Sequence, residues 1–286
     1  MSNNVLLIGE LISNGGLGLQ GDIITVTSLG ANPLLAVAAV STIHNPLNRL
    51  FRVIDTDFLI QQIEDARKRP GFSSIKIGAL CNQEMVEALG DYINTNMSDV
   101  PVVYCPIVVS DMGAPLLDVK GIQMVQRVLI PVVDTLVLNI YDAEILSGIT
   151  ITGVDQMERA AIKLRQFGAT SVVITGGLLD GAELYDVFLD KDGLKIMRLG
   201  KHDVHVDNPF RFGGAWILAT AIATALGQGM TIFDAINLAR QYVDAAISHN
   251  AEADNKYQSM YLTHTLGKFK YDADKSAYKA VDVAKA

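Results

Sequence analysis

The fold of this chain is decided near its start, where VLLIG at residues 5–9 is followed four residues later by NGGLGLQGD at residues 14–22. The first run predicts a buried strand, and Gly18–Leu29 predicts a helix because its apolar residues recur at helical spacing. Glycines at such a junction let a ligand approach the backbone, and a helix start offers free N–H groups to an anion. The stretch fits neither a Walker A loop nor GxGxxG. Its counterpart is a second glycine-rich stretch, Arg211–Trp216 (RFGGAW), which is expected to open a second apolar helix.

The composition narrows the classes of function. Half of the 286 residues are hydrophobic, yet no stretch reaches the apolar length of a membrane span. The net charge is −8 with no basic tract, which disfavours nucleic acid and anionic membranes as partners. The two cysteines, Cys81 and Cys105, favour a reducing compartment and are interpreted as small buried apolar residues. Since the start also lacks the basic segment of a signal peptide, we expect a cytoplasmic protein.

Short apolar runs alternate with longer amphipathic segments along most of the chain. This alternation predicts an α/β fold with a mostly parallel sheet covered by helices on both faces. The expected strands are Val5–Gly9, Leu34–Ser41, Ser74–Ile77, Val102–Cys105, Thr135–Leu138 and Ser171–Thr175, with a later hairpin of Leu184–Leu189 and Leu194–Leu199. The expected helices are Gly18–Leu29, Asp57–Lys68, Gln83–Thr95, Gly121–Leu129, Asp155–Phe167, Gly214–Leu226 and Ile232–His249.

The pattern runs without a linker or an internal repeat, so we expect one α/β domain over residues 1–250. From residue 251 to residue 286 the chain becomes rich in Lys, Asp, Ala and Tyr and loses its core-facing period. This polar extension is predicted either to belong to the same domain or to be mobile.

Several short motifs occur along the chain in a fixed order. The glycine stretch at residues 14–22 precedes KIGAL at 76–80, CPIV at 105–108, GAPLL at 113–117, LNIYDAE at 138–144, TGG at 175–177 and FGGA at 212–215. In this order the chain resembles the hydroxymethylpyrimidine/phosphomethylpyrimidine kinases of thiamine biosynthesis, which belong to the ribokinase superfamily. The resemblance implies a three-layer ribokinase-like fold. For an active member it also implies phosphorylation of a pyrimidine hydroxymethyl group by ATP and Mg²⁺.

The resemblance places an alanine where the family has its catalytic base. In the family, a late glycine turn forms an anion hole and ends in a cysteine that takes the substrate proton. The matching turn here consists of Phe212, Gly213 and Gly214, and Ala215 stands at the base position. Alanine has no titratable atom, so no catalytic residue is assigned. Trp216 replaces a small polar residue and is expected to crowd a nucleotide site or to pack beneath the turn.

Among the positions that the resemblance assigns to nucleotide and metal binding, three have also lost the family's residues. Cys105 stands for an aspartate, Thr175 for a lysine beside Gly177, and Asp142 for a glutamate after Asn139. Asn139 and Asp142 would belong to a metal network in an active kinase. The same pair suits the cap of the following helix, which is the interpretation that we favour.

The substrate side is expected to contain Gly15, Gly16, Asp22, His44 and Ala79. The glutamine that holds the pyrimidine in the family falls at His44 or at the residue before it, and the methionine on the ring falls at Ala79. The two glycines also suit a tight turn without a ligand, and His44 suits a turn that ends a strand. The five histidines form no metal-binding pattern, so no metal ligand is assigned.

Three classes of function remain open. The chain could be an active ATP- and Mg²⁺-dependent kinase of a pyrimidine or pyridoxal-like alcohol, a non-catalytic homologue that binds a small heteroaromatic ligand, or a non-catalytic self-assembling scaffold. The combined loss of base, cation, carboxylate and pyrimidine contacts favours a non-catalytic homologue, which needs no cofactor. We also expect a homo-oligomer, a dimer or a larger assembly with filaments included, because family members associate through helices and sheet edges.

Overall fold

The structure is a computed structural model, which describes residues 3–13, 18–45, 48–109, 116–179, 184–199, 210–252 and 269–276. One nine-stranded sheet crosses the molecule in the order β3-β2-β1-β4-β5-β6-β7-β8-β9. The strands are β1 (Asn4–Ile12), β2 (Asn32–Asn45), β3 (Asn48–Val53), β4 (Ser74–Ile77), β5 (Val102–Tyr104), β6 (Thr135–Leu138), β7 (Ser171–Thr175), β8 (Leu184–Asp190) and β9 (Gly193–Leu199).

The strands from β2 to β7 in this order run parallel to one another. At one edge, β3 pairs with β2 in the antiparallel sense. At the other edge, β8 and β9 form an antiparallel hairpin against β7. The predicted α/β fold with a mostly parallel sheet is therefore confirmed.

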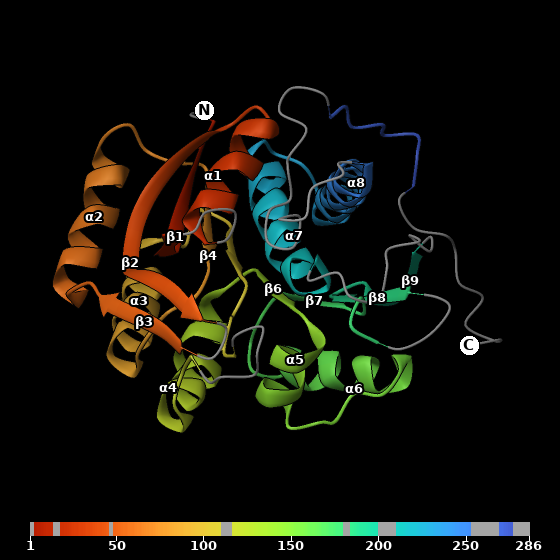
Figure 1. The fold of residues 1–286 in the computed structure, drawn as a ribbon, viewed down its shortest axis with the longest axis horizontal. Helices are drawn as coiled ribbons and strands as arrows, with labels where there is room; N and C mark the ends of the chain where they lie inside the picture. Colours follow the sequence, from red (N-terminus) through yellow and green to blue (C-terminus); the bar gives the residue numbers. More distant parts are fainter. Residues whose placement is uncertain are drawn as a thin grey trace.

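Helices cover both faces of the sheet (Figure 1). One face packs against α1 (Leu19–Ser28), α7 (Phe210–Gly227) and α8 (Ile232–Glu252). The other face packs against α2 (Thr56–Lys68), α3 (Gln83–Asn96), α4 (Val119–Met124), α5 (Ile140–Ser147) and α6 (Val154–Arg165). No helix in the described ranges is long and apolar enough to cross a membrane.

The central strands are apolar because both of their faces are buried. Every residue of β4, β6 and β7 is buried. Successive side chains of β7 alternate between the two cores, since Val172 and Ile174 pack on one face and Val173 on the other. Strands buried on both faces appear in the sequence as continuous apolar runs, which is why these strands were predicted with their observed bounds.

The expected pattern was wrong at the β2–β3 edge. The strand predicted to end at Ser41 continues to Asn45, so His44 lies within β2 and not in a turn that follows it. Its partner β3 was not predicted, because NRLFRV is short and lacks regular alternation. The predicted helix Gly121–Leu129 is also divided, with α4 ending at Met124 and a π-helical turn at Val125–Leu129.

The start of α7 differs from expectation, whereas the described part of the polar extension is compatible with the first of its two predicted placements. α7 begins at Phe210, so the predicted glycine turn at residues 212–214 lies within the helix and not before it. Within the extension, Phe269 and Tyr271 pack against the core beside α8, and the Gln241 amide donates to the Asp272 carbonyl oxygen at 3.0 Å. Residues 253–268 and 277–286 lie outside the described residues, as do His202 and His205.

Candidate functional site

The candidate site lies at the carboxyl edge of the parallel strands, where β1, β4, β6 and β7 end. Open parallel sheets bind ligands at this edge because the connecting loops and helix starts converge there. Gly18 begins α1 with φ of 64°, and a Cβ at this position would lie 2.3 Å from the Glu10 carbonyl oxygen. Only glycine fits this close approach, so Gly18 has a structural role in the turn.

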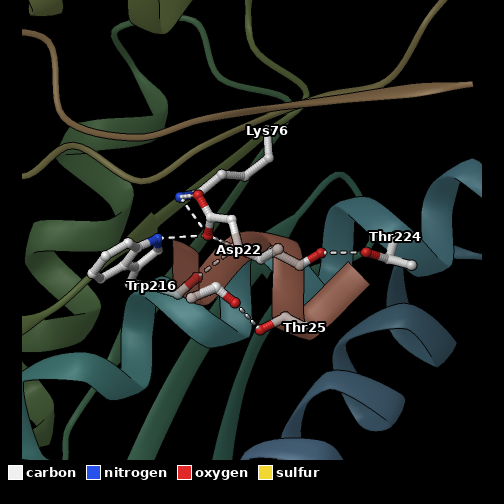
Figure 2. A network of polar contacts seen from close by, with 7 residues as sticks. Asp22, Thr25, Lys76, Trp216 and Thr224 are labelled. Carbon is white, nitrogen blue, oxygen red and sulfur yellow. Dashed lines mark hydrogen bonds and ion pairs between the residues drawn. The ribbon is translucent and has the colours of Figure 1, made fainter. Parts of the chain in front are cut away.

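Asp22 is the centre of a buried polar network at this edge (Figure 2). The Lys76 ammonium donates to both carboxylate oxygens, at 3.0 Å to Oδ1 and 2.7 Å to Oδ2. The Trp216 indole Nε1–H donates to Oδ1 at 2.7 Å, and the Thr220 hydroxyl donates to the same oxygen. These contacts join α1, β4 and α7. Asp22, predicted on the substrate side, is therefore held by internal donors.

Lys76 is buried almost completely, with 1% of its side chain exposed, against 3% for Asp22. A buried ammonium requires a compensating charge, which the Asp22 carboxylate supplies. The Lys76 Nζ atom also lies 5.1 Å from the centroid of the Trp216 ring, within the range of a cation–π contact. A Cβ at Gly78 would lie 3.1 Å from this nitrogen, so Gly78 leaves room for it.

Ala215 and Trp216 occupy the first turns of α7. Ala215 is buried at 3% exposure and presents a methyl group where the resemblance places the base. Trp216 packs beneath the helix start, as one of its two predicted placements requires. Gly214 has open space around it, since a Cβ there would meet no described atom within 4 Å. The side chains of Phe212 and Gly213 lie outside the described residues.

The positions assigned to a metal network hold a buried thiol and two polar side chains that make internal hydrogen bonds. Burial, partly offset by Lys76, raises the pKa of the Cys105 thiol to about 12, so the side chain is a neutral thiol. Asn139 caps α5 by accepting a hydrogen bond from the Asp142 amide at 2.9 Å, which confirms the predicted cap. The Asp142 Oδ1 atom accepts from the Val108 amide at 3.0 Å. Mg²⁺ prefers carboxylate and water oxygens, so of these three side chains the Asp142 carboxylate is of the kind that Mg²⁺ prefers and the Cys105 thiol is not.

The turn after β7 is held by hydrogen bonds to neighbouring strands. The Thr175 hydroxyl donates to the Leu138 carbonyl oxygen at 3.3 Å, so it does not replace the missing lysine. Asp186 accepts a hydrogen bond from the Gly176 amide at 3.1 Å. A Cβ at Gly176 would lie 2.0 Å from the Tyr185 carbonyl oxygen, whereas a Cβ at Gly177 would meet no described atom within 4 Å.

The remaining predicted residues have mixed outcomes. Ala79 follows β4 and is buried at 6% exposure. Gly15 and Gly16 lie outside the described residues, and of His44 only the backbone is described. Cys81, expected to be buried, is half-buried.

Sequence reasoning missed four polar residues of this region, namely Lys76, Thr220, Asp186 and Arg240. Asp186 and Arg240 are both buried, and the guanidinium lies 3.5 Å from the carboxylate. Burial raises the pKa of Asp186 although Arg240 opposes the shift. For Lys76 the sequence did contain a signal, since it is a charged residue within an apolar strand. A buried lysine requires a partner of opposite charge, so such a partner could have been predicted. Thr220 within an apolar helix carried no comparable signal.

The comparisons with known proteins agree with the α/β fold. The family described as phosphomethylpyrimidine kinase matches residues 13–261. The hydroxymethylpyrimidine/phosphomethylpyrimidine kinase of Haemophilus influenzae is 31% identical over 259 residues, which cover 87% of this chain and 93% of that protein. Among solved structures, the phosphomethylpyrimidine kinase of Clostridium difficile aligns with a TM-score of 0.73 at 26% identity, covering 85% of this chain and 99% of that one. The Bacillus subtilis pyridoxal kinase in its ADP complex aligns with a TM-score of 0.78 at 25% identity, covering 90% and 95%.

Proposed function

The chain belongs to the phosphomethylpyrimidine kinase family, and from this premise we propose that it binds a nucleotide-like ligand at the carboxyl edge of its sheet without transferring phosphate. One observation carries the proposal. At the position that the resemblance assigns to the base, the structure has the buried methyl group of Ala215, which has no titratable atom to accept a proton.

The proposed absence of phosphoryl transfer is supported by two further positions besides Ala215. A general base contributes about 10²–10⁴-fold to the rate, and one electrostatic donor contributes about 10²–10³-fold. Cys105 is a neutral thiol, and the Thr175 hydroxyl is directed to a backbone carbonyl. Neither side chain can place a charge beside a migrating phosphoryl group.

The retention of binding is supported by Gly177 and Gly214. Neither glycine has a positive φ, and neither is crowded by described atoms, so the backbone geometry and packing of the described residues do not require glycine at these two positions. Glycines without such a requirement suit the close approach of a ligand to the backbone. The related Bacillus subtilis pyridoxal kinase binds ADP, which makes a nucleotide the ligand class to test first.

The test combines binding with turnover. Thermal unfolding is measured with ATP–Mg²⁺, ADP and hydroxymethylpyrimidine, and ADP release is measured with the pyrimidine present. We expect ATP or ADP to raise the melting temperature, since a ligand of the folded state stabilises it by mass action, and we expect no pyrimidine-dependent ADP release. Gly214→Ala should weaken the nucleotide effect while leaving the unliganded fold as stable or more stable, because alanine favours a helix. The control is Gly153→Ala, at the start of α6 on the other face.

An active kinase is the second candidate, because a relative named as a kinase is 31% identical to this chain over most of its length. In that case ATP and Mg²⁺ would be required, and a water molecule or a residue at another position would have to replace the base. Robust ADP release that depends on the pyrimidine alcohol would establish this candidate and refute the non-catalytic proposal. A protein that neither binds nucleotide nor releases ADP would contradict both.

A further inference from the structure

Trp216 is held in the way that a protein holds a bound aromatic ligand. It is the only tryptophan of the chain, and it lies on α7 with 9% of its surface exposed. Its indole N–H donates to the Asp22 carboxylate at 2.7 Å, and the Lys76 ammonium lies 5.1 Å from the centroid of the ring (Figure 2). A hydrogen-bond acceptor for the ring N–H and a cation over the ring are contacts that recognise a flat heteroaromatic molecule.

The polar groups around the ring do not depend on the indole for their own pairing. Lys76 contacts both oxygens of Asp22, and Thr220 donates to Oδ1 as well. An ionised carboxylate has about four acceptor positions, so the indole N–H is an additional donor to a group that is already paired. The Asp22–Lys76 pair would therefore remain in place if the indole were removed, with one acceptor position facing the vacated space.

The ring also lies beside the part of the sheet edge where a ligand is proposed to bind. Trp216 follows Ala215 and lies two residues from Gly214, the helical glycine at which a Cβ would meet no described atom within 4 Å. Asp22 belongs to the first turn of α1, and Lys76 is the penultimate residue of β4, two residues before Gly78. The indole thus fills a space bounded by two helix starts and a strand end, which is where ligands of open α/β sheets bind.

We infer that the Trp216 indole is an internal occupant of a ring-binding site, and that Trp216 is the specificity-determining residue that excludes external heteroaromatic rings from it. The ligand class of the vacated site is a small flat ring with an N–H or amino donor, which would take the indole's place on Asp22. The inference rests on the proposed function in one respect, namely that ligands bind at the carboxyl edge of the sheet. It makes no use of nucleotide binding.

The experiment compares ring binding by the full-length protein and its Trp216 variants. The probes are indole and hydroxymethylpyrimidine, and binding is measured by isothermal titration calorimetry. We expect no binding to the wild type at about 1 mM probe, and at least about tenfold tighter binding to Trp216→Ala, because a cavity with a buried acceptor is opened. Trp216→Phe is the matched control, since it keeps a ring in the site and should exclude both probes.

A second substitution tests the role of the carboxylate. In the Trp216→Ala background, Asp22→Asn should weaken binding of both probes by about tenfold, since a charged acceptor is replaced by a neutral one. Trp216→Thr serves in place of Trp216→Ala if the alanine variant does not fold, as judged by circular dichroism. Wild-type binding as tight as that of the opened variant, or a folded opened variant that binds neither probe, would overturn the inference.

The same proteins separate this inference from the proposed function. Nucleotide binding is followed by the thermal shift with ADP in the wild type. A wild type without an ADP shift, together with an alanine variant that binds the rings, would refute the proposed nucleotide binding and support the internal occupant. A wild type with an ADP shift, together with a folded alanine variant that binds neither ring, would support nucleotide binding and refute the role of Trp216.

Discussion

The buried pair of Asp22 and Lys76 permits a quantitative test of how this edge of the sheet is held together. Each single substitution leaves a charge without its partner. Lys76→Met leaves the Asp22 carboxylate with Trp216 and Thr220 as its donors among the described side chains, and Asp22→Asn leaves the Lys76 ammonium facing a neutral amide. The double variant contains neither charge.

The magnitude follows from the burial of the two side chains, which are 3% and 1% exposed. Removing one member of a buried ion pair costs about 3–5 kcal/mol, because the remaining charge is desolvated without compensation. The shortest Nζ–carboxylate distance is 2.7 Å, so the two groups interact directly and their substitutions should not be additive. We expect the double variant to be destabilised by at least about 2 kcal/mol less than the sum of the two single variants.

The assay is urea unfolding followed by circular dichroism, with the four proteins measured under one set of conditions. With an m-value of about 3 kcal/mol/M, each single variant should lower the unfolding midpoint by about 1–1.7 M. The m-value should be the same in all four proteins. Additive effects, or single variants that cost less than about 1 kcal/mol, would show that the pair is hydrated or absent in solution and would refute the network as described.

Three further predictions concern other parts of the chain. At pH 8, iodoacetamide should label the half-buried Cys81 and leave Cys105 unlabelled until the protein is denatured, as mass spectrometry would show, because a thiol with a pKa of about 12 is about 0.01% thiolate. Burial raises the folded-state pKa of Asp186 above its unfolded value, so its contribution to stability should be full below the unfolded pKa and be lost as pH rises through the folded pKa. Asp186→Asn should flatten this part of the stability profile measured by urea unfolding, and an unchanged slope would contradict the assignment. We also propose a homo-oligomer joined at the β3 edge, where Leu50 and Phe58 are exposed. Light scattering should give a mass of at least twice 30.9 kDa, and Leu50→Lys should lower this mass. An unchanged mass would show that the β3 edge is not the interface.

Much of the fold was predictable because the relevant signals are local. β4, β6 and β7 were predicted with their observed bounds, since strands buried on both faces form short apolar runs between amphipathic helices. The cap of α5 by Asn139 was predictable for the same reason, because donor and acceptor are three residues apart. The edge strand β3 was not, since its short, partly exposed sequence carries little periodic signal.

The sequence by itself determined that the chain is an α/β protein of this family and that Ala215 stands where a base is expected. Only the tertiary structure decided the surroundings of that position. Asp22 meets Lys76 across 54 residues and Trp216 across 194. The periodicity of the sequence cannot predict contacts between residues so far apart, because they depend on how β4 and the starts of α1 and α7 pack against one another. The sequence showed that a tryptophan replaces a small residue, and the fold determined that its indole N–H lies on a buried carboxylate.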